Sequence, residues 1–218
     1  MKRRNNYIVF SALAGILAIT GDLVSQFVLG TYYPGYDQLK DTVSKLGTSI
    51  SPISDQLSTL WIIVGVLLIF FGIGIKKEFS EKGGYAKLAS GLIMLYGFCE
   101  GIGSGAFKAD RVANVLTTSG IIHEILGSIG VISILLLPLV MLKVITKNKN
   151  PALYRLSRII FASGLFFILL FLFRFTSGDN FIVIYKELWQ RLFILNSYIY
   201  LFVIAFQMIK GTIKIRQE

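Results

Sequence analysis

The sequence contains few charged residues, one cysteine and one histidine, and each shortage excludes a class of protein. Charged residues make up 16% of the 218 residues, against about 25% in soluble domains, and hydrophobic residues make up 54%. This composition argues against a water-soluble globule and against a disordered chain. Cys99 has no second cysteine to pair with, and a lone His123 excludes any site built from several histidines.

Long apolar runs are what the sequence has in abundance. A helix needs about 20 apolar residues to cross a bilayer core of roughly 30 Å. Six runs approach that length, at about 7–29, 57–75, 85–104, 118–142, 153–175 and 188–209. They are too long for buried strands and lack the alternation of a membrane barrel. We therefore expect an all-α fold, a polytopic membrane bundle of six transmembrane helices in which residues 1–218 form a single domain.

The net charge of +10 has two explanations, nucleic-acid binding and membrane topology, and the positions of the charges favour topology. With a cytoplasmic N-terminus, 15 of the 22 basic residues fall in inner segments, as the positive-inside rule requires. No small-residue cleavage site follows the first run, so we expect it to remain as an uncleaved span. Both termini are then cytoplasmic, and no nucleic-acid partner is expected.

The acidic residues show the opposite distribution. Nine of the 12 fall at the outer ends of the spans or in the outer loops. Insertion depends little on Asp and Glu, so the membrane does not require this asymmetry. It has two explanations, which are the solubility of the outer surface and a polar site in the outer half of the bundle.

The first span carries a stripe of small and polar residues. Ser11, Gly15, Ala18, Asp22 and Ser25 recur at steps of three and four, which keeps them on one helical face. Small residues on one face let helices approach closely in lipid, so the stripe predicts a buried face that includes Asp22. A carboxylate at that depth is a functional candidate. The alternative is an acid that reaches out to the outer interface.

The third and fourth spans carry similar stripes. Gly97, Gly101 and Gly105 recur at four-residue steps beside Glu100, and the glycine-rich run after Gly101 is expected to loosen the helix rather than to cradle a phosphate. In the fourth span, His123 shares a face with Gly127 and Gly130, while Glu124 and Ser128 share the neighbouring face. We expect spans one, three and four to pack closely through these stripes.

The outer ends of these three spans are predicted to form one polar pocket, with Asp22, Glu100 and His123 inside it and Glu124 at its rim. Arg174 and Arg191 lie at the same depth on the last two spans. Such a set could pair internally, bind an anionic headgroup or coordinate a metal, but no ligand-spacing motif is present and no metal is expected. No cofactor is expected either. A lone histidine disfavours haem, and retinal would need a lysine deep in a span for its attachment, which the sequence lacks. His123 has a simpler alternative as a hydrogen-bonded packing residue.

The loop from Gly30 to Gln56 is long enough to fold over the outer mouth of the bundle, and it carries motifs of a known family. Tyr33-Pro-Gly-Tyr-Asp37 and Ser44-Lys-Leu-Gly47, followed by Asp110 and by Gly120-Ile-Ile-His123, resemble the six-span prokaryotic membrane family catalogued as domain of unknown function 998. The resemblance implies a six-helix bundle in a prokaryotic cytoplasmic membrane and supplies no reaction. It places the recurrent family positions at Asp37, Ser44, Asp110 and His123.

Three function hypotheses remain open at this stage. The first is a protein that binds or moves a lipid or small amphiphile, with membrane lipids as partners and binding residues Asp22, Asp37, Glu100, His123, Glu124, Arg174 and Arg191. The second is a membrane hydrolase or transferase acting on a lipid. Its candidate catalytic residues are His123, Glu100, Asp22, Asp110 and the nucleophile Ser44. The third is a structural partner subunit, and the sequence leaves the oligomeric state undetermined.

Overall fold

The computed structural model describes residues 5–148, 150–172 and 180–211, with the side chain of Lys186 left out. Within these residues five helices are long and apolar enough to cross a membrane. They are α1 (Asn6–Gly30), α2 (Ser54–Glu78), α5 (Thr118–Val144), α6 (Pro151–Leu172) and α8 (Lys186–Lys210). The chain is an all-α membrane bundle, and these helices correspond to five of the six predicted spans.

The remaining predicted span is helical but divided. It consists of α3 (Gly83–Tyr96), a π-helical turn η3 (Gly97–Gly103) and the single turn α4 (Ser104–Ala106). Its longest uninterrupted helix is therefore too short to count as a span by length alone. The physical reason is the glycine content, because glycine is a poor helix former and lets the backbone adopt the wider π turn. The expected loosening of this helix is thus confirmed, although it begins inside the span.

The short elements lie in the connections. A 3₁₀ turn η1 (Val43–Gly47) lies between α1 and α2, and a second turn η2 (Ser80–Lys82) precedes α3. Strands β1 (Arg111–Val112) and β2 (Val115–Leu116) form a hairpin whose two turn residues have positive φ. Helix α7 (Phe181–Ile184) precedes α8.

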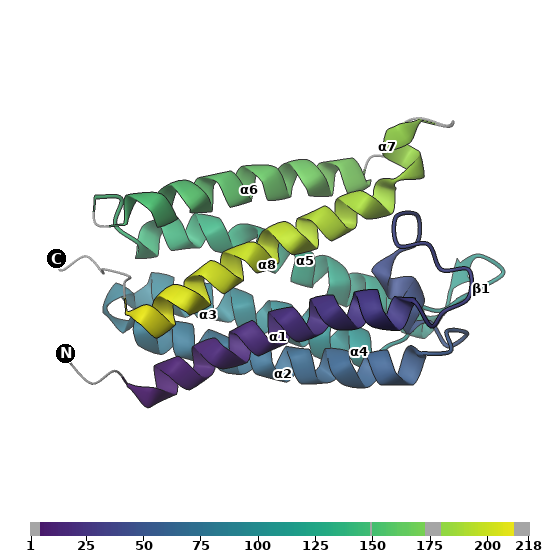
Figure 1. The fold of residues 1–218 in the computed structure, drawn as a ribbon, viewed down its shortest axis with the longest axis horizontal. Coiled ribbons are helices and arrows are strands. Elements are labelled where there is room, and N and C mark those ends of the chain that lie inside the picture. The colour runs from purple at the N-terminus through teal and green to yellow at the C-terminus, as the bar shows by residue number, and fades with distance from the viewer. Residues whose placement is uncertain (1–4, 149, 173–179, 212–218) are drawn as a thin grey trace.

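The helices run along the bundle (Figure 1), and their contacts close a ring in sequence order. Each of α1, α2, α3, α5, α6 and α8 packs on the next, and α8 closes the ring against α1. The described start of α1 and the end of α8 lie at the same end of the bundle. The ring corrects one expectation. Spans three and four pack together as predicted, but α1 packs on α2 and α8 instead of joining them.

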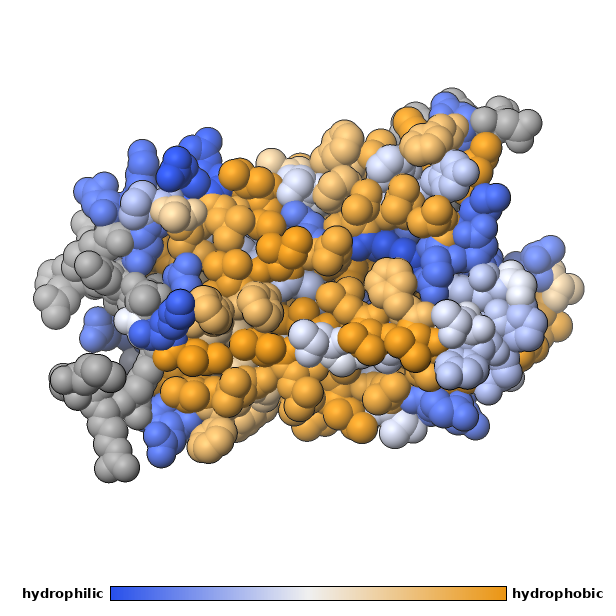
Figure 2. Space-filling model, in the orientation of Figure 1, coloured by the Kyte–Doolittle hydropathy of each residue, from blue (hydrophilic) through white to orange (hydrophobic). Residues whose placement is uncertain are grey.

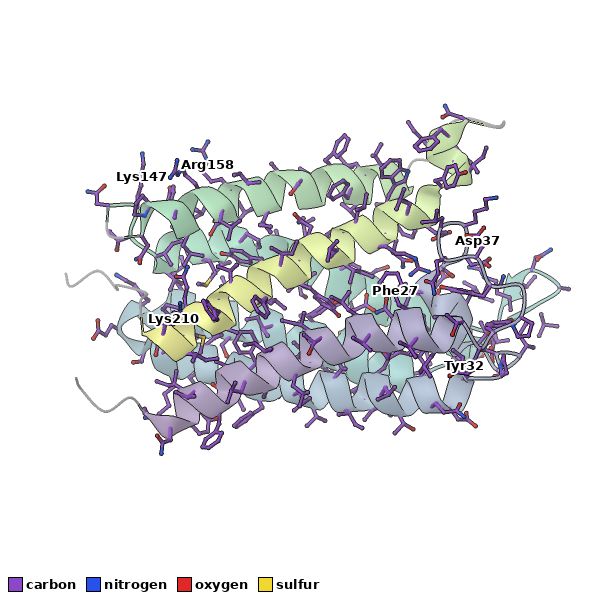
Figure 3. All side chains as sticks on the ribbon, in the orientation of Figure 1. Phe27, Tyr32, Asp37, Lys147, Arg158 and Lys210 are labelled. Carbon is purple, nitrogen blue, oxygen red and sulfur yellow. The ribbon has the colours of Figure 1, made fainter. Side chains whose placement is uncertain are left out.

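The surface has an apolar belt between two polar ends (Figure 2). Lys147, Arg158 and Lys210 mark one end, called here the basic end (Figure 3). Tyr32 and Asp37 mark the opposite end, called the loop end, which carries residues 31–53 and the β1–β2 hairpin. An apolar belt with polar caps is what a bilayer requires of a spanning bundle, so the chain is a multi-pass integral membrane protein.

The interior combines apolar packing with hydrogen bonds between helices. Phe71 on α2 and Leu137 on α5 are fully buried in the main core. Between α6 and α8, Asn196 Nδ2 donates to Ile160 O at 2.9 Å and Ser163 Oγ donates to Asn196 Oδ1 at 2.7 Å. These contacts form a hydrogen-bonded seam between α6 and α8, as polar side chains do between helices in a membrane.

The small-residue stripes lie where helices meet, but with different partners from those expected. All five stripe residues of α1 are buried, among them Asp22. The glycines of the third span face α2, because a Cβ at position 101 would lie 2.6 Å from Gly65 N and 2.9 Å from Trp61 O. Gly127, expected to be equally tight, has only Glu100 Oε1 nearby, at 3.6 Å from the Cβ position.

Replacing Gly101 with leucine is therefore expected to lower the thermal unfolding temperature in detergent by several degrees. The added side chain must push apart two backbones, and overpacking of this kind costs about 1–3 kcal/mol or more. Gly91→Leu is the matched control, because a Cβ at Gly91 meets nothing within 4 Å. Equal unfolding temperatures for the two variants would contradict the close contact between α2 and η3.

The predicted orientation can be tested by cysteine labelling in whole cells. In a Cys99→Ser background, Ile50→Cys at the loop end is expected to react with an impermeant maleimide, because Ile50 is 83% exposed. Asn148→Cys at the basic end is expected to react only after the cells are permeabilised. Labelling of position 148 alone from outside would reverse the assigned orientation.

Candidate functional site

A buried carboxylate on α1 forms the centre of the candidate site. Asp22 is 4% exposed and lies eight residues before the end of α1, about 12 Å along the helix. Its Oδ2 accepts hydrogen bonds from Tyr198 Oη at 2.7 Å and from Gln26 Nε2 at 2.6 Å. The Trp61 indole on α2 interacts with the same carboxylate. Asp22 is therefore held by side chains from α1, α2 and α8.

A second tyrosine extends this network to the third span. Tyr96 Oη donates to Tyr198 Oη at 3.1 Å, and the two rings pack edge to face with their centroids 6.4 Å apart. Tyr96 and Tyr198 are 6% and 3% exposed. A continuous chain of hydroxyl groups thus runs from α3 through α8 to the carboxylate on α1. In a bilayer such a chain satisfies buried polar groups that have no access to water.

Glu100 supplies a second carboxylate from the π-helical turn. Its side chain lies in a notch between η3 and α5 that exists because α5 has glycine at two positions. A Cβ at Gly130 would lie 2.5 Å from Glu100 Cγ, and one at Gly127 would lie 3.6 Å from Glu100 Oε1. Glu100 and Gly127 are both partly exposed, whereas Gly130 is buried. Glu100 therefore lies between the interior of the bundle and the flank of α5.

The two carboxylates belong to one group, called here the acid cluster, which contains Asp22, Gln26, Tyr96, Glu100 and Tyr198. Asp22 and Glu100 are close enough to interact electrostatically. In the described part of the chain neither forms an ion pair with a lysine, arginine or histidine. Two neighbouring acids within a membrane bundle, with no basic partner, are unusual because their charged forms are costly in low dielectric.

His123 makes its contacts elsewhere. It is 7% exposed, and its Nδ1 lies 2.8 Å from Phe107 O, so this nitrogen carries the proton that is donated to the carbonyl. Glu124 and Asp110 are charged groups that interact with the imidazole. Glu124 of α5 pairs with Arg111 of β1. The structure therefore brings Asp22 and Glu100 together and gives His123 the packing contact that was its alternative interpretation.

Residues 31–53, called here the strap, cover the loop end. Val43, Leu46 and Ile53 are buried against Leu57 and Trp61 of α2, which confirms that the loop folds over the bundle. Because Trp61 also interacts with Asp22, the strap lies directly beyond the acid cluster.

Arg191 of α8 holds the strap in place. It is 9% exposed and donates to Gln38 O, to Tyr36 Oη at 2.5 Å and to Asp41 O at 3.1 Å. Burial raises the pKa of the Tyr36 hydroxyl, although Arg191 opposes this shift. Burial also acts to raise the pKa of Asp41, but hydrogen bonds from Asp37 N and Lys45 outweigh it and hold that pKa below its usual range. The guanidinium thus has a structural role at this site.

The other predicted site residues lie in the strap or beside it. Asp37 Oδ1 accepts from Leu39 N at 2.8 Å, and Ser44 Oγ donates to Thr42 Oγ1 at 3.0 Å. Asp110 accepts from Ser49 N at 2.7 Å and from Ser49 Oγ at 2.5 Å, which ties the strap to the hairpin. Arg174 lies outside the described residues.

Sequence reasoning missed the two tyrosines and Gln26. Gln26 stands four residues after Asp22, the spacing of helical neighbours, so this pair was accessible to the stripe argument. Tyr96 and Tyr198 gave no such signal, because a tyrosine in an apolar run resembles any other aromatic packing residue. Only their positions in the ring show that their hydroxyl groups meet.

Replacing Tyr198 with phenylalanine tests the network. The change removes a donor to Asp22 and the acceptor used by Tyr96, and unmet buried hydrogen bonds cost about 1–3 kcal/mol. We expect the unfolding temperature to fall by several degrees. Tyr85→Phe is the control, because Tyr85 is 50% exposed. An unchanged unfolding temperature for Tyr198→Phe would show that the hydroxyl chain contributes no stability.

The comparisons with known proteins give one finding. The sequence model of the family described as "Protein of unknown function (DUF998)" matches residues 12–207, which include the acid cluster and the strap. The comparisons with curated proteins and with solved structures returned no match.

Proposed function

Because this chain belongs to the DUF998 family, whose description brings no reaction with it, we propose a function from the geometry of the site. The protein binds a lipid or small amphiphile whose polar headgroup reaches the acid cluster. The observation that carries this proposal is the notch at Gly127 and Gly130, where the Glu100 side chain packs against α5 and the residue remains partly exposed.

The chemistry of the acid cluster favours a headgroup that donates hydrogen bonds or carries positive charge. Asp22 and Glu100 have no basic partner among the described residues, so an ammonium group would supply the missing charge. Trp61, Tyr96 and Tyr198 add aromatic rings beside the acids, and aromatic faces attract cations. We therefore assign an amine-bearing amphiphile as the ligand class.

The path to the cluster is lateral. The strap packs over the loop end. A ligand that entered along the bundle axis would therefore have to displace the strap from Trp61. The notch instead lies on the flank of α5, where Glu124 and Ser128 are exposed near Gly127. With both termini in the cytoplasm of a prokaryotic cell, the notch opens to the outer leaflet of the cytoplasmic membrane.

The alternative enzyme hypothesis draws less support from the geometry. A lipid hydrolase or transferase needs a nucleophile within hydrogen-bond reach of its base. Ser44 Oγ donates to Thr42, and His123 Nδ1 donates to a backbone carbonyl. Neither contact activates a nucleophile, so we favour binding.

Lipid binding can be measured by native mass spectrometry or by fluorescence with the full-length protein and phosphatidylethanolamine, with diacylglycerol as a lipid that has neither an amine nor a phosphate. We expect Glu100→Gln to weaken binding of the amine lipid about tenfold or more, the loss typical of a charge-assisted hydrogen bond. Gly127→Leu is expected to weaken it as well, because its Cβ makes only an ordinary contact with Glu100 and the rest of the side chain occupies the notch.

Gly91→Leu is the matched control, since it adds the same side chain to an open lipid-facing position. All three variants should keep the unfolding temperature of the parent protein within a few degrees. Unchanged affinity for phosphatidylethanolamine in both Glu100→Gln and Gly127→Leu would refute the proposed site.

A further inference from the structure

A hollow at the basic end is not used by the acid cluster or by the strap. Its volume is about 930 Å³, and it lies between the start of α3 and the turn that joins α5 to α6. The lining includes Lys82, Lys143 and Lys147 together with Tyr85, Tyr154 and Leu88. At this end of the bundle the chain meets the lipid headgroups of the leaflet opposite to the one that the notch faces.

The charge of the hollow is positive. The residues that line it include three lysines and only one residue with a carboxylate, Glu81. Within the part of the chain that the structure describes, neither Lys143 nor Lys147 forms an ion pair. Two exposed cations on one wall, with no carboxylate paired to them, provide a binding surface for an anion.

Two consecutive glycines leave part of the lining of the hollow without side chains. Gly83 and Gly84 line the hollow, and a Cβ at either position would meet nothing within 4 Å. No side chain caps the start of α3, and its first turn contains no acidic residue. The Gly83 N–H donates to Ser80 O, but the positive end of the α3 dipole still borders the hollow and adds to its preference for a negative group.

The apolar residues beside the lysines distinguish a lipid from a free anion. Tyr85 is 50% exposed and Leu88 is 49% exposed, and they continue from the hollow along the lipid-facing side of α3. A headgroup phosphate held by Lys143 and Lys147 would thus leave its acyl chains against an apolar surface. Tyrosine rings at this level suit the boundary between headgroups and hydrocarbon.

We propose that this hollow binds the phosphate group of an anionic membrane lipid through Lys143 and Lys147, with the acyl chains lying along Tyr85 and Leu88. The site is independent of the proposed amine site, because it lies at the opposite end of the bundle and has the opposite charge. The two lysines recognise the phosphate, and the molecule that carries this phosphate is a lipid rather than a free anion.

The experiment uses the full-length protein and measures affinity for phosphatidylglycerol, with phosphatidylcholine as the neutral-headgroup comparison. Lys143→Ala/Lys147→Ala is expected to weaken binding of phosphatidylglycerol about tenfold or more, from the contribution of two cations near a lipid surface. Gly84→Leu is expected to weaken it too, because the side chain occupies the hollow while every charge remains.

The matched control is Arg155→Ala/Arg158→Ala. It removes two exposed basic residues at the same end of the bundle, and neither residue lines the hollow. Retained affinity in this control, with loss in the other two variants, supports the proposal. An equal loss in the control would overturn it, because general surface charge would then explain binding.

Inorganic phosphate and glycerol phosphate separate the lipid from a free anion. We expect each to compete with phosphatidylglycerol only weakly, because neither has acyl chains to contact Tyr85 and Leu88. Competition by inorganic phosphate at an affinity equal to that of the lipid would overturn the assignment of a lipid ligand.

Discussion

The contact between α2 and the glycine stripe of the third span is the constraint on which the loop-end half of the bundle depends. Cβ atoms at Gly97 and Gly101 would lie 2.8 Å from Gly65 O and 2.6 Å from Gly65 N, so these segments meet through their backbones. This approach brings the π-helical turn onto α2. Glu100 stands beside the stripe, so its side chain is directed to α5, where Gly127 and Gly130 leave room for it. The notch is thus a consequence of packing on the other side of the same turn.

The bilayer imposes a second constraint, which is that buried polar groups must find partners within the protein. Asp22 accepts hydrogen bonds from Tyr198 and Gln26, and Tyr198 in turn accepts a hydrogen bond from Tyr96. Glu100 is different, because the residue is partly exposed and its charge interacts with both Asp22 and Tyr96 of the cluster. The more accessible of the two acids is therefore also the one nearer to the proposed path of the ligand.

The sequence predicted the faces of the helices well and their neighbours poorly. Periodicity placed Asp22 on the buried face of α1, because a membrane interior excludes a carboxylate from lipid regardless of the partner helix. Periodicity says nothing about the order of helices around the ring, which sets Tyr198 of α8, rather than a residue of α5, against Asp22. His123 shows the same limit, since its face was predicted correctly but a carbonyl at Phe107 takes its hydrogen bond.

The hydrogen bonds that Arg191 donates to the strap also constrain the order of assembly. The residues that it joins are separated by as many as 155 positions, and Asp22 and Tyr198 are separated by 176. During synthesis from the N-terminus, α1, α2 and the strap exist well before α8 does. The ring therefore stays open between α1 and α6 until the last helix inserts. Insertion of α8 then closes the ring, covers the Asp22 carboxylate and fastens the strap in a single late step.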